Sequence, residues 1–232
     1  MASDPVPPVK PITPTSPHDF IEGVDIPPSK PDATAHEATK ETSAKPKAVD
    51  CEIDGATVEQ TMPFNGADIG DKACGVAAPV KLLGIHDRDH RTSFSSPITV
   101  SCEFAKVFAE WLQEDVLPAA EEHLEHSIVK LRNGPGYQCR RRNNQPDGKL
   151  SEHALGKAVD LTGFQLGDST FVSVQEDWGA ETREGRFLKS IHASACKRFT
   201  TVLGPDADPN HKSHFHLDIG CHGKSCTYLI CQ

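Results

Sequence analysis

The stretch that decides the fold reads Ser151-Glu152-His153-Ala154-Leu155-Gly156-Lys157-Ala158-Val159-Asp160. Further along, the chain continues with a second polar stretch, which reads His211-Lys212-Ser213-His214-Phe215-His216-Leu217-Asp218. Both stretches place metal-binding side chains within an alternation of apolar and polar residues. Such an alternation is typical of a β-strand that buries only one of its faces. We therefore expect both stretches to contribute strands to the site of the protein.

The second stretch predicts a strand over residues 213–219. Successive side chains of a strand point to opposite faces of the sheet. Its apolar residues, Phe215 and Leu217, are therefore expected in the core. Its polar residues, His214, His216 and Asp218, are expected to share the opposite face and to line a cleft.

The first stretch predicts a second strand with Asp160 on its polar face. Gly156 allows the chain to turn between His153 and this strand, because glycine tolerates backbone angles that other residues avoid. Zinc binds imidazole and carboxylate groups, and a catalytic zinc site typically uses three protein ligands. We therefore predict that His153, Asp160 and His216 hold Zn²⁺ as the cofactor.

The remaining polar residues of the two stretches suggest roles around this predicted ion. His214 is the first choice for a general base, since it lies two residues from a ligand and imidazole titrates near neutral pH. His211 is expected to orient the substrate or to stabilise developing charge, and Glu152 is the second choice for the base. Ser151 and Asp218 are expected to fix the ligand imidazoles through hydrogen bonds.

These motifs also resemble those of a known group of proteins. The pattern S-x-H-x-x-G-x-A-x-D followed by H-x-H is similar to zinc peptidases of the group that contains lysostaphin, D-Ala-D-Ala peptidases and the hedgehog signalling domain. Within that group the chain more closely resembles the bacterial extensin-like C-terminal domain family, over residues from about 74 to 220. The histidine spacing at 211, 214 and 216 is also similar to that of penicillin-insensitive murein endopeptidases. The segments that carry the extensin-like resemblance are Tyr137-Gln138-Cys139-Arg140-Arg141-Arg142-Asn143, Leu150-Ser151-Glu152-His153-Ala154, Phe199-Thr200-Thr201-Val202-Leu203-Gly204-Pro205 and His214-Phe215-His216-Leu217-Asp218.

The resemblance implies hydrolysis of peptide bonds in peptidoglycan, with an arginine that grips a carboxylate of the stem peptide. A guanidinium group suits this task because it donates two parallel hydrogen bonds. Arg140 is the first choice and Arg142 the second, because both share one face of a strand predicted over residues 137–142. Solvated or paired surface arginines are the alternative. Trp178 is a candidate wall of the substrate cleft, with core packing as the alternative.

Composition excludes some classes of partner. The 232 residues carry a formal charge of −9, which argues against nucleic acid, since phosphates require a basic surface. No apolar run reaches the roughly 20 residues of a membrane-spanning helix. The first residues do not form a signal peptide, so we expect one to have been removed. We expect a monomer whose partners are peptidoglycan stem peptides.

Eight cysteines indicate an oxidising compartment, and we predict disulfides and a periplasmic location. Within this framework, Cys51 is expected to bridge to the segment that begins at Cys74, and Cys196 is a candidate partner of Cys139. A metal knot of the three C-terminal cysteines, at 221, 226 and 231, is the competing interpretation.

The chain divides into two parts. Residues 1–50 hold ten of the 18 prolines and predict a disordered linker. Residues 51–232 predict an α+β domain in which a small antiparallel sheet carries the zinc site and helices pack on one side. Apolar spacing predicts helices over residues 102–113 and 181–199, with a further helical turn from Pro118.

The sequence and the resemblance together predict a zinc-dependent endopeptidase that cuts cross-links between stem peptides. The bond between D-Ala and diaminopimelate and the bond between two diaminopimelate residues both remain open. Two alternatives are a D,D-carboxypeptidase and a module that binds peptidoglycan and retains zinc without turnover.

Overall fold

A computed structural model of the protein describes residues 50–66, 71–86 and 90–232. The predicted linker of residues 1–50 lies outside these residues, except for its last position. The described residues belong to one structural unit, Ala44–Gln232. None of the helices found among them combines the length and the apolar character that a bilayer span requires.

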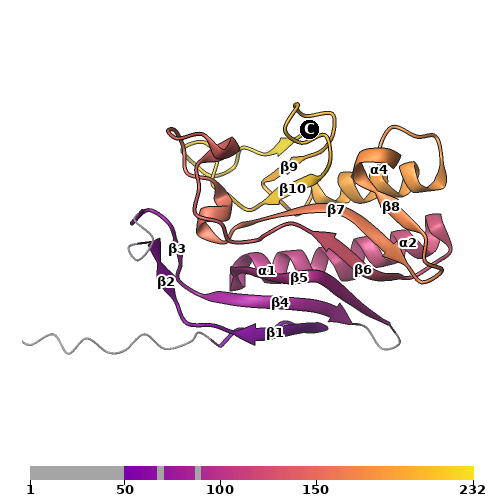
Figure 1. Ribbon diagram of the computed structural model, residues 1–232, viewed down its shortest axis with the longest axis horizontal. Coiled ribbons are helices and arrows are strands. Elements are labelled where there is room, and N and C mark those ends of the chain that lie inside the picture. The colour runs from indigo at the N-terminus through magenta and orange to yellow at the C-terminus, as the bar shows by residue number, and fades with distance from the viewer. Residues whose placement is uncertain (1–49, 67–70, 87–89) are drawn as a thin grey trace, which may run out of the picture. The chain divides into compact units, whose positions relative to one another are not determined.

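A large mixed sheet forms the framework (Figure 1). Within the described residues it has nine strands, in the order β1-β4-β5-β6-β7-β10-β9-β11, and β8 pairs with β7 beside this path. The strands are β1 (Ala56–Gln60), β4 (Pro79–His86), β5 (Arg91–Ser101), β6 (Ile128–Asn133), β7 (Ala158–Leu166), β8 (Phe171–Ser173), β9 (Thr201–Leu203), β10 (Phe215–Asp218) and β11 (Ile230–Cys231). A separate ribbon pairs β2 (Phe64–Asn65) with β3 (Gly75–Val76).

The prediction of a small antiparallel sheet is therefore wrong in size and partly in direction, since β5–β6 and β9–β11 are parallel pairs. The largest omission is β5, which contains Pro97. Its pairing with β4 is irregular between Leu82 and Gly84, so Pro97 lies where the ladder is interrupted. Proline is tolerated at such a bulge because no ladder hydrogen bond is required there.

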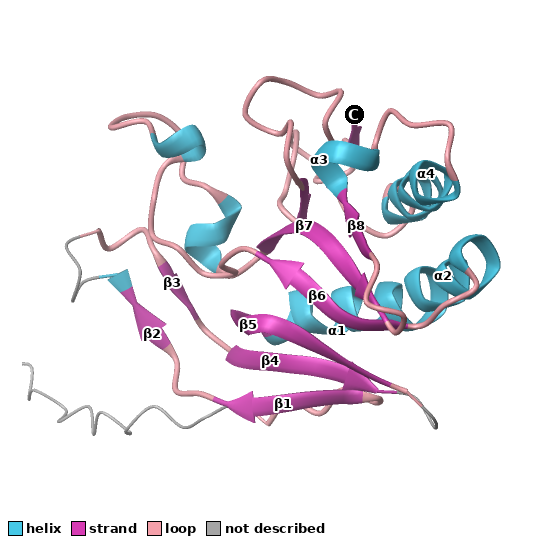
Figure 2. Ribbon diagram, turned by 45° about the vertical axis from the view of Figure 1, so that its right-hand side comes forward, coloured by secondary structure: helices cyan, strands magenta, loops and turns pink. Residues whose placement is uncertain are grey.

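The helices α1, α2 and α4 lie along one face of the sheet (Figures 1 and 2). They are α1 (Cys102–Trp111), the π-helical turn η2 (Leu112–Val116), α2 (Leu117–Leu124), α3 (Val174–Asp177) and α4 (Arg183–Ala195). Ser101 begins α1 and Thr182 begins α4, and each side chain accepts a hydrogen bond from a backbone N–H of its helix. The helices predicted over residues 102–113 and 181–199 are thus present.

The core lies between these helices and the sheet. Phe104, Phe108 and Trp111 of α1 are fully buried. The ring of Phe108 contacts those of Phe104 and Trp111, and the ring of Phe199 contacts the same two. Burying a side chain of this kind stabilises the fold by about 1.5–3 kcal/mol. Because the helices cover this face, the other face of β7 and β10 is left for the site.

Four disulfides use all eight cysteines, as the composition predicted. The pairs are Cys51–Cys102, Cys74–Cys139, Cys196–Cys231 and Cys221–Cys226. The expected pairings of Cys51 with Cys74 and of Cys139 with Cys196 are wrong, and so is the metal knot at the C-terminus. The three long-range pairs, which close loops of 51, 65 and 35 residues, each stabilise the fold by about 4 kcal/mol through loop closure.

The strand predicted over residues 137–142 is also absent. The backbone of this segment bonds elsewhere: Tyr137 N–H donates to Thr99 and Gln138 N–H donates to His153. A short 3-10 turn, η3 (Arg142–Asn144), follows, in which Asn143 has a left-handed φ of 53°. The segment therefore forms an irregular wall in front of the sheet instead of a further strand.

Candidate metal centre

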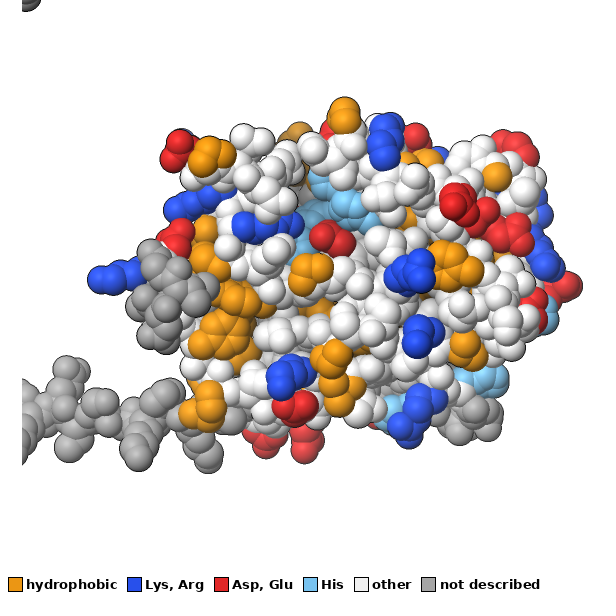
Figure 3. Space-filling view, in the orientation of Figure 1, with side chains coloured by type: hydrophobic (Ala, Val, Ile, Leu, Met, Phe, Trp, Pro, Cys, Tyr) orange, Lys and Arg blue, Asp and Glu red, His pale blue; other side chains and the backbone are white. Residues whose placement is uncertain are grey.

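A hollow on the open face of the sheet collects most of the predicted site residues. Its volume is about 610 Å³. Its floor is formed by β7 and β10, and the segment 135–152 and residues from β9 and β11 line its sides. Figure 3 shows histidine side chains gathered in a hollow of this face, beside basic side chains and next to an acidic one.

Strand pairing brings two of the three predicted ligands, Asp160 and His216, together. β7 and β10 are antiparallel, and Asp160 lies directly opposite His216 in the ladder. Directly opposed side chains on one face of an antiparallel pair are neighbours in space. Phe215 and Leu217, on the other face of β10, are fully buried. The predicted alternation along this strand is therefore confirmed.

A 3-10 turn supplies the third predicted ligand. His153 lies in η4 (Glu152–Leu155), which ends at Gly156 with a left-handed φ of 64°. A β-carbon at this position would lie 2.8 Å from Val76, so glycine is needed both for the angle and for the space. The turn places the fully buried His153 side chain against the start of β7.

The three donor atoms form a nearly equilateral triangle. His153 Nε2 lies 3.2 Å from His216 Nδ1 and 3.3 Å from Asp160 Oδ1, and His216 Nδ1 lies 3.0 Å from Asp160 Oδ1. A tetrahedral zinc ion with bonds of about 2.0–2.1 Å has neighbouring ligand atoms about 3.3–3.4 Å apart. Two imidazoles and one carboxylate at this spacing fit one face of such a coordination shell.

Hydrogen bonds on the far side of each imidazole fix which nitrogen faces this triangle. His153 Nδ1–H donates to the carbonyl oxygen of Gly136 at 2.7 Å, and His216 Nε2–H donates to Asp218 Oδ2 at 3.1 Å. Such outer partners are typical of metal-ligating histidines. Asp218 lies where its predicted role requires. Ser151 is buried at the edge of the hollow, but the acceptor for His153 is the Gly136 carbonyl and not Ser151.

Comparison with known sequences adds one observation. The sequence model of the family described as extensin-like protein C-terminus matches residues 49–232. The chain belongs to the extensin-like C-terminal family. The matched region includes all the residues of the hollow. No curated protein and no solved structure gives a significant match to the chain.

The charges of the extensin-like site hold the metal-free triangle together. Burial raises the pKa of Asp160, but its interactions with the adjacent imidazoles of His153 and His216 outweigh burial and lower that pKa well below its ordinary range. Burial lowers the pKa of His216, but hydrogen bonds to Asp160 and Asp218 outweigh it and raise the pKa to about 9. Without a metal ion, His216 is therefore protonated on both ring nitrogens at neutral pH, and this imidazolium lies between the carboxylates of Asp160 and Asp218.

The two predicted catalytic histidines lie beside the triangle. His214 Nε2 is 3.8 Å from Asp160 Oδ1, and its ring centre is 5.2 Å from that of His211. Burial lowers the pKa of His214, and the opposing charge of Asp160 does not restore it. His214 is therefore neutral at pH 7 in the metal-free protein. His211 Nδ1 lies 2.8 Å from Asp208 Oδ2, a carboxylate that the sequence interpretation did not consider.

Of the predicted substrate residues, two line the hollow and one does not. Arg140 and Arg142 are part of its wall, and Trp178 is the one that does not line it. Arg141, which was not a predicted substrate residue, donates to Asp71 at 2.9 Å. Of the two interpretations of Trp178, the structure shows core packing. Its ring contacts the buried face of β10 at Phe215, with 5.3 Å between the ring centres, because the indole is apolar enough to pack under the strand.

The hollow contains residues that the sequence did not single out. Gly136 contributes a backbone carbonyl, which no side-chain pattern reveals. Asp208 stands three residues before His211, and this spacing was visible as a possible pair. His222 also lines the hollow, and its Nε2 is 2.6 Å from the hydroxyl of Thr201 and 3.7 Å from Asp218 Oδ1.

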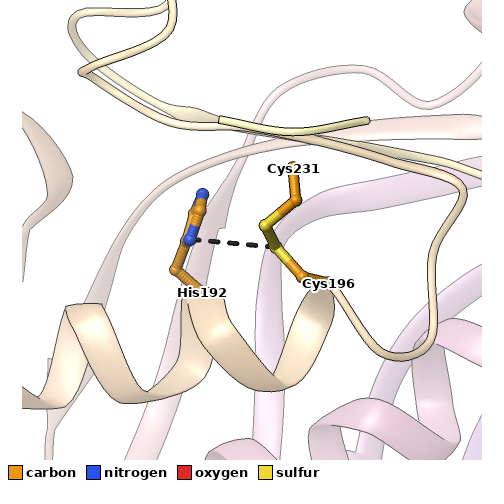
Figure 4. Close-up of side chains that lie close together, drawn as sticks. All are labelled: His192, Cys196 and Cys231. Carbon is orange, nitrogen blue, oxygen red and sulfur yellow. Dashed lines mark hydrogen bonds between the residues drawn. A yellow bond between two sulfur atoms is a disulfide. The ribbon is translucent and has the colours of Figure 1, made fainter. Parts of the chain in front are cut away.

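Two further groups bring metal-binding atoms together outside the hollow. One contains His192, Cys196 and Cys231, and the other contains Asp71, Cys74 and Cys139. In both groups the cysteines are joined in a disulfide, which removes the thiolates that a metal would bind. Figure 4 shows the first group, in which His192 Nδ1 lies 4.0 Å from Cys196 Sγ. The triangle of His153, Asp160 and His216 is therefore the metal-site candidate that remains among the described residues.

Proposed function

We propose that this extensin-like domain is a zinc peptidase that hydrolyses cross-links between peptidoglycan stem peptides in the periplasm. The observation that carries the proposal is the triangle of His153 Nε2, Asp160 Oδ1 and His216 Nδ1, with sides of 3.0–3.3 Å, at the base of an open hollow. The resemblance of its motifs to those of zinc peptidases supports the same conclusion. The four disulfides are compatible with a location outside the cytoplasm.

The three ligand atoms would hold Zn²⁺ with one side directed to the hollow. When bound, the ion would supply Lewis-acid polarisation to a scissile carbonyl group and to a water molecule. The chain supplies the remaining chemistry. Asp160 contributes the one negative charge of the set, and Asp218 and the Gly136 carbonyl hold the two imidazoles in their orientations.

Proton transfer is assigned to the histidines that border the triangle. Burial lowers the pKa of His214, which favours the neutral imidazole, and a neutral imidazole has one ring nitrogen free to accept a proton. A neutral imidazole beside the scissile bond accepts the proton of the attacking water and returns it to the leaving amine. His211 lines the same hollow, and its ring centre lies 5.2 Å from that of His214.

Substrate recognition is assigned to Arg140 and Arg142, the two arginines that line the hollow and that we call the arginine wall. Arg140 Nε donates to Gln138 Oε1 at 2.9 Å, and in the part of the chain that the structure describes Arg140 forms no ion pair with a carboxylate. Arg142 Nη2, in contrast, lies 3.6 Å from Glu152 Oε1. Arg140 therefore remains the better candidate for the stem-peptide carboxylate, because its charge is not already matched.

The test is digestion of purified sacculi, with the released muropeptides sorted by mass. An endopeptidase lowers the amount of cross-linked muropeptide dimers and raises the amount of monomers. The mass of each product identifies the bond that was cut. His153→Ala should abolish the change. The matched control is His126→Ala, since His126 is a surface residue paired with Asp168.

Two results would replace the proposal. Trimming of terminal D-Ala without loss of cross-links identifies a D,D-carboxypeptidase. Tight binding to sacculi that survives His214→Ala, with unchanged muropeptides, identifies a zinc-containing binding module.

A further inference from the structure

Asp208 and His211 form a pair of side chains at the edge of the hollow. Asp208 Oδ2 lies 2.8 Å from His211 Nδ1, and both residues line the hollow. His211 is mostly buried, and its ring lies 5.9 Å from that of the proposed ligand His216. A carboxylate accepts only, so the Nδ1 atom of His211 must be the donor in this hydrogen bond.

The second oxygen of Asp208 fixes the direction of this bond. Asp208 Oδ1 accepts from the backbone N–H of Asn210 at 2.7 Å. Each carboxylate oxygen therefore has its own donor, and the group cannot rotate without losing one of them. The consequence is that Oδ2 remains directed at His211.

Hydrogen bonds to Asp206 and Pro205 hold the loop that carries Asp208 in place. Asp206 Oδ2 accepts from Trp178 Nε1 at 2.8 Å and from Lys189 Nζ at 3.1 Å. Lys212 Nζ donates to the carbonyl oxygen of Pro205 at 2.6 Å. Trp178 thus packs under β10 at Phe215 and holds the loop through Asp206.

We propose that Asp208 is a positioning residue that locks His211 in the tautomer with its proton on Nδ1, so that the Nε2 lone pair is presented to the hollow. The proton on Nδ1 stays in the hydrogen bond to Asp208 whether His211 is neutral or charged. Any proton that His211 accepts or delivers is therefore carried on Nε2, on the side of the proposed metal ligands. His214 lacks such a partner: its Nδ1 contacts only the Ser213 hydroxyl among the described residues, at 3.5 Å. Of the two histidines, His211 is the one that the protein orients.

Asp208→Asn tests this assignment with a small change in shape. The Asn210 N–H keeps the amide oxygen on its side, so the amide NH₂ group would face His211 Nδ1. Since NH₂ only donates, Nδ1 must become the acceptor and the proton must move to Nε2. The same substitution in the Ser-His-Asp triad selects the wrong tautomer and lowers kcat.

The first readout is the tautomer of His211, measured by long-range ¹H–¹⁵N correlation of histidine-labelled protein. His211→Gln identifies the signals. We expect the proton on Nδ1 in the wild type and on Nε2 in Asp208→Asn. Asp168→Asn is the matched control, because Asp168 also pairs with a histidine, His126, at 3.2 Å, but lies on the surface. An unchanged tautomer in Asp208→Asn would overturn the assignment.

The second readout rests on the proposed function. In muropeptide hydrolysis, Asp208→Asn should lower kcat about 100-fold, leave KM within about twofold and leave the zinc content unchanged. A wild-type kcat would overturn the assignment. If the wild type itself hydrolyses nothing, the proposed function fails while the tautomer measurement still decides the role of Asp208. Asp208→Ala, in which both tautomers should appear, replaces Asp208→Asn if that variant does not fold.

Discussion

Zinc binding to the candidate centre should become stronger as the pH rises, because the ion replaces a proton on His216. The metal-free protein holds this proton between Asp160 and Asp218, which raise the pKa of His216 to about 9 despite its burial. A ligand imidazole must be neutral. Below about pH 9, each zinc ion that binds must therefore release the His216 proton, whereas Asp160 has a lowered pKa and is already ionised.

The size of the effect follows from the distance between the working pH and this pKa. At about pH 7 the proton must be removed about two units below its pKa, which costs about 3 kcal/mol, or a factor of about 100 in the apparent zinc affinity. The apparent affinity should rise about tenfold per pH unit from about pH 6 and level off near pH 9. Calorimetry in buffers with different ionisation enthalpies should detect about one released proton per zinc at about pH 7.

Asp218→Asn supplies the internal control for this prediction. Removing one of the two carboxylates lowers the pKa of His216, so the affinity curve should level off at a lower pH. Asp168→Asn, on the surface, should leave the curve of the wild type unchanged. An affinity that is flat over this pH range, with no proton released, would refute the account of the metal-free site.

The remaining predictions concern the turn, the arginine wall and their controls. Gly156→Ala places a β-carbon 2.8 Å from Val76 at a left-handed φ, so we expect thermal scans to show a loss of more than about 1 kcal/mol and titrations to show weaker zinc binding. Gly179→Ala has open space and should be neutral in both assays. Arg140→Ala should raise KM for a stem peptide about tenfold or more, the value expected for a charged hydrogen bond. Arg141→Ala should leave KM unchanged and lower stability by less than about 1 kcal/mol, since its Asp71 pair is half-exposed; equal effects of the two substitutions on KM would remove Arg140 from substrate binding.

The local features of the site could be read from the sequence because they depend on short-range geometry. The period of two along β10 correctly predicted that Phe215 and Leu217 are buried and that His216 faces the other way. The turn at Gly156 was predictable for the same reason, since a left-handed residue favours glycine. What the sequence did not contain was the register that places Asp160 opposite His216, because strand pairing is decided by contacts distant in the chain.

The errors also have physical causes. No strand was predicted over β5, and its Pro97, which a regular strand disfavours, is tolerated because the pairing with β4 is irregular there. The role of Trp178 was left open between the cleft and the core because a loop position does not reveal which face a side chain takes. The disulfide partners were not predictable, since pairing depends on the folded distance between cysteines rather than on their spacing.

Elemental analysis of zinc per chain tests the central claim most directly. The purified protein, reloaded with zinc and freed of excess metal, should hold one ion per chain. His153→Ala and His216→Ala should each reduce this value to near zero, and His126→Ala, on the surface, should retain it. A wild type without zinc, or ligand variants that keep a full complement, would contradict a metal centre formed by His153, Asp160 and His216.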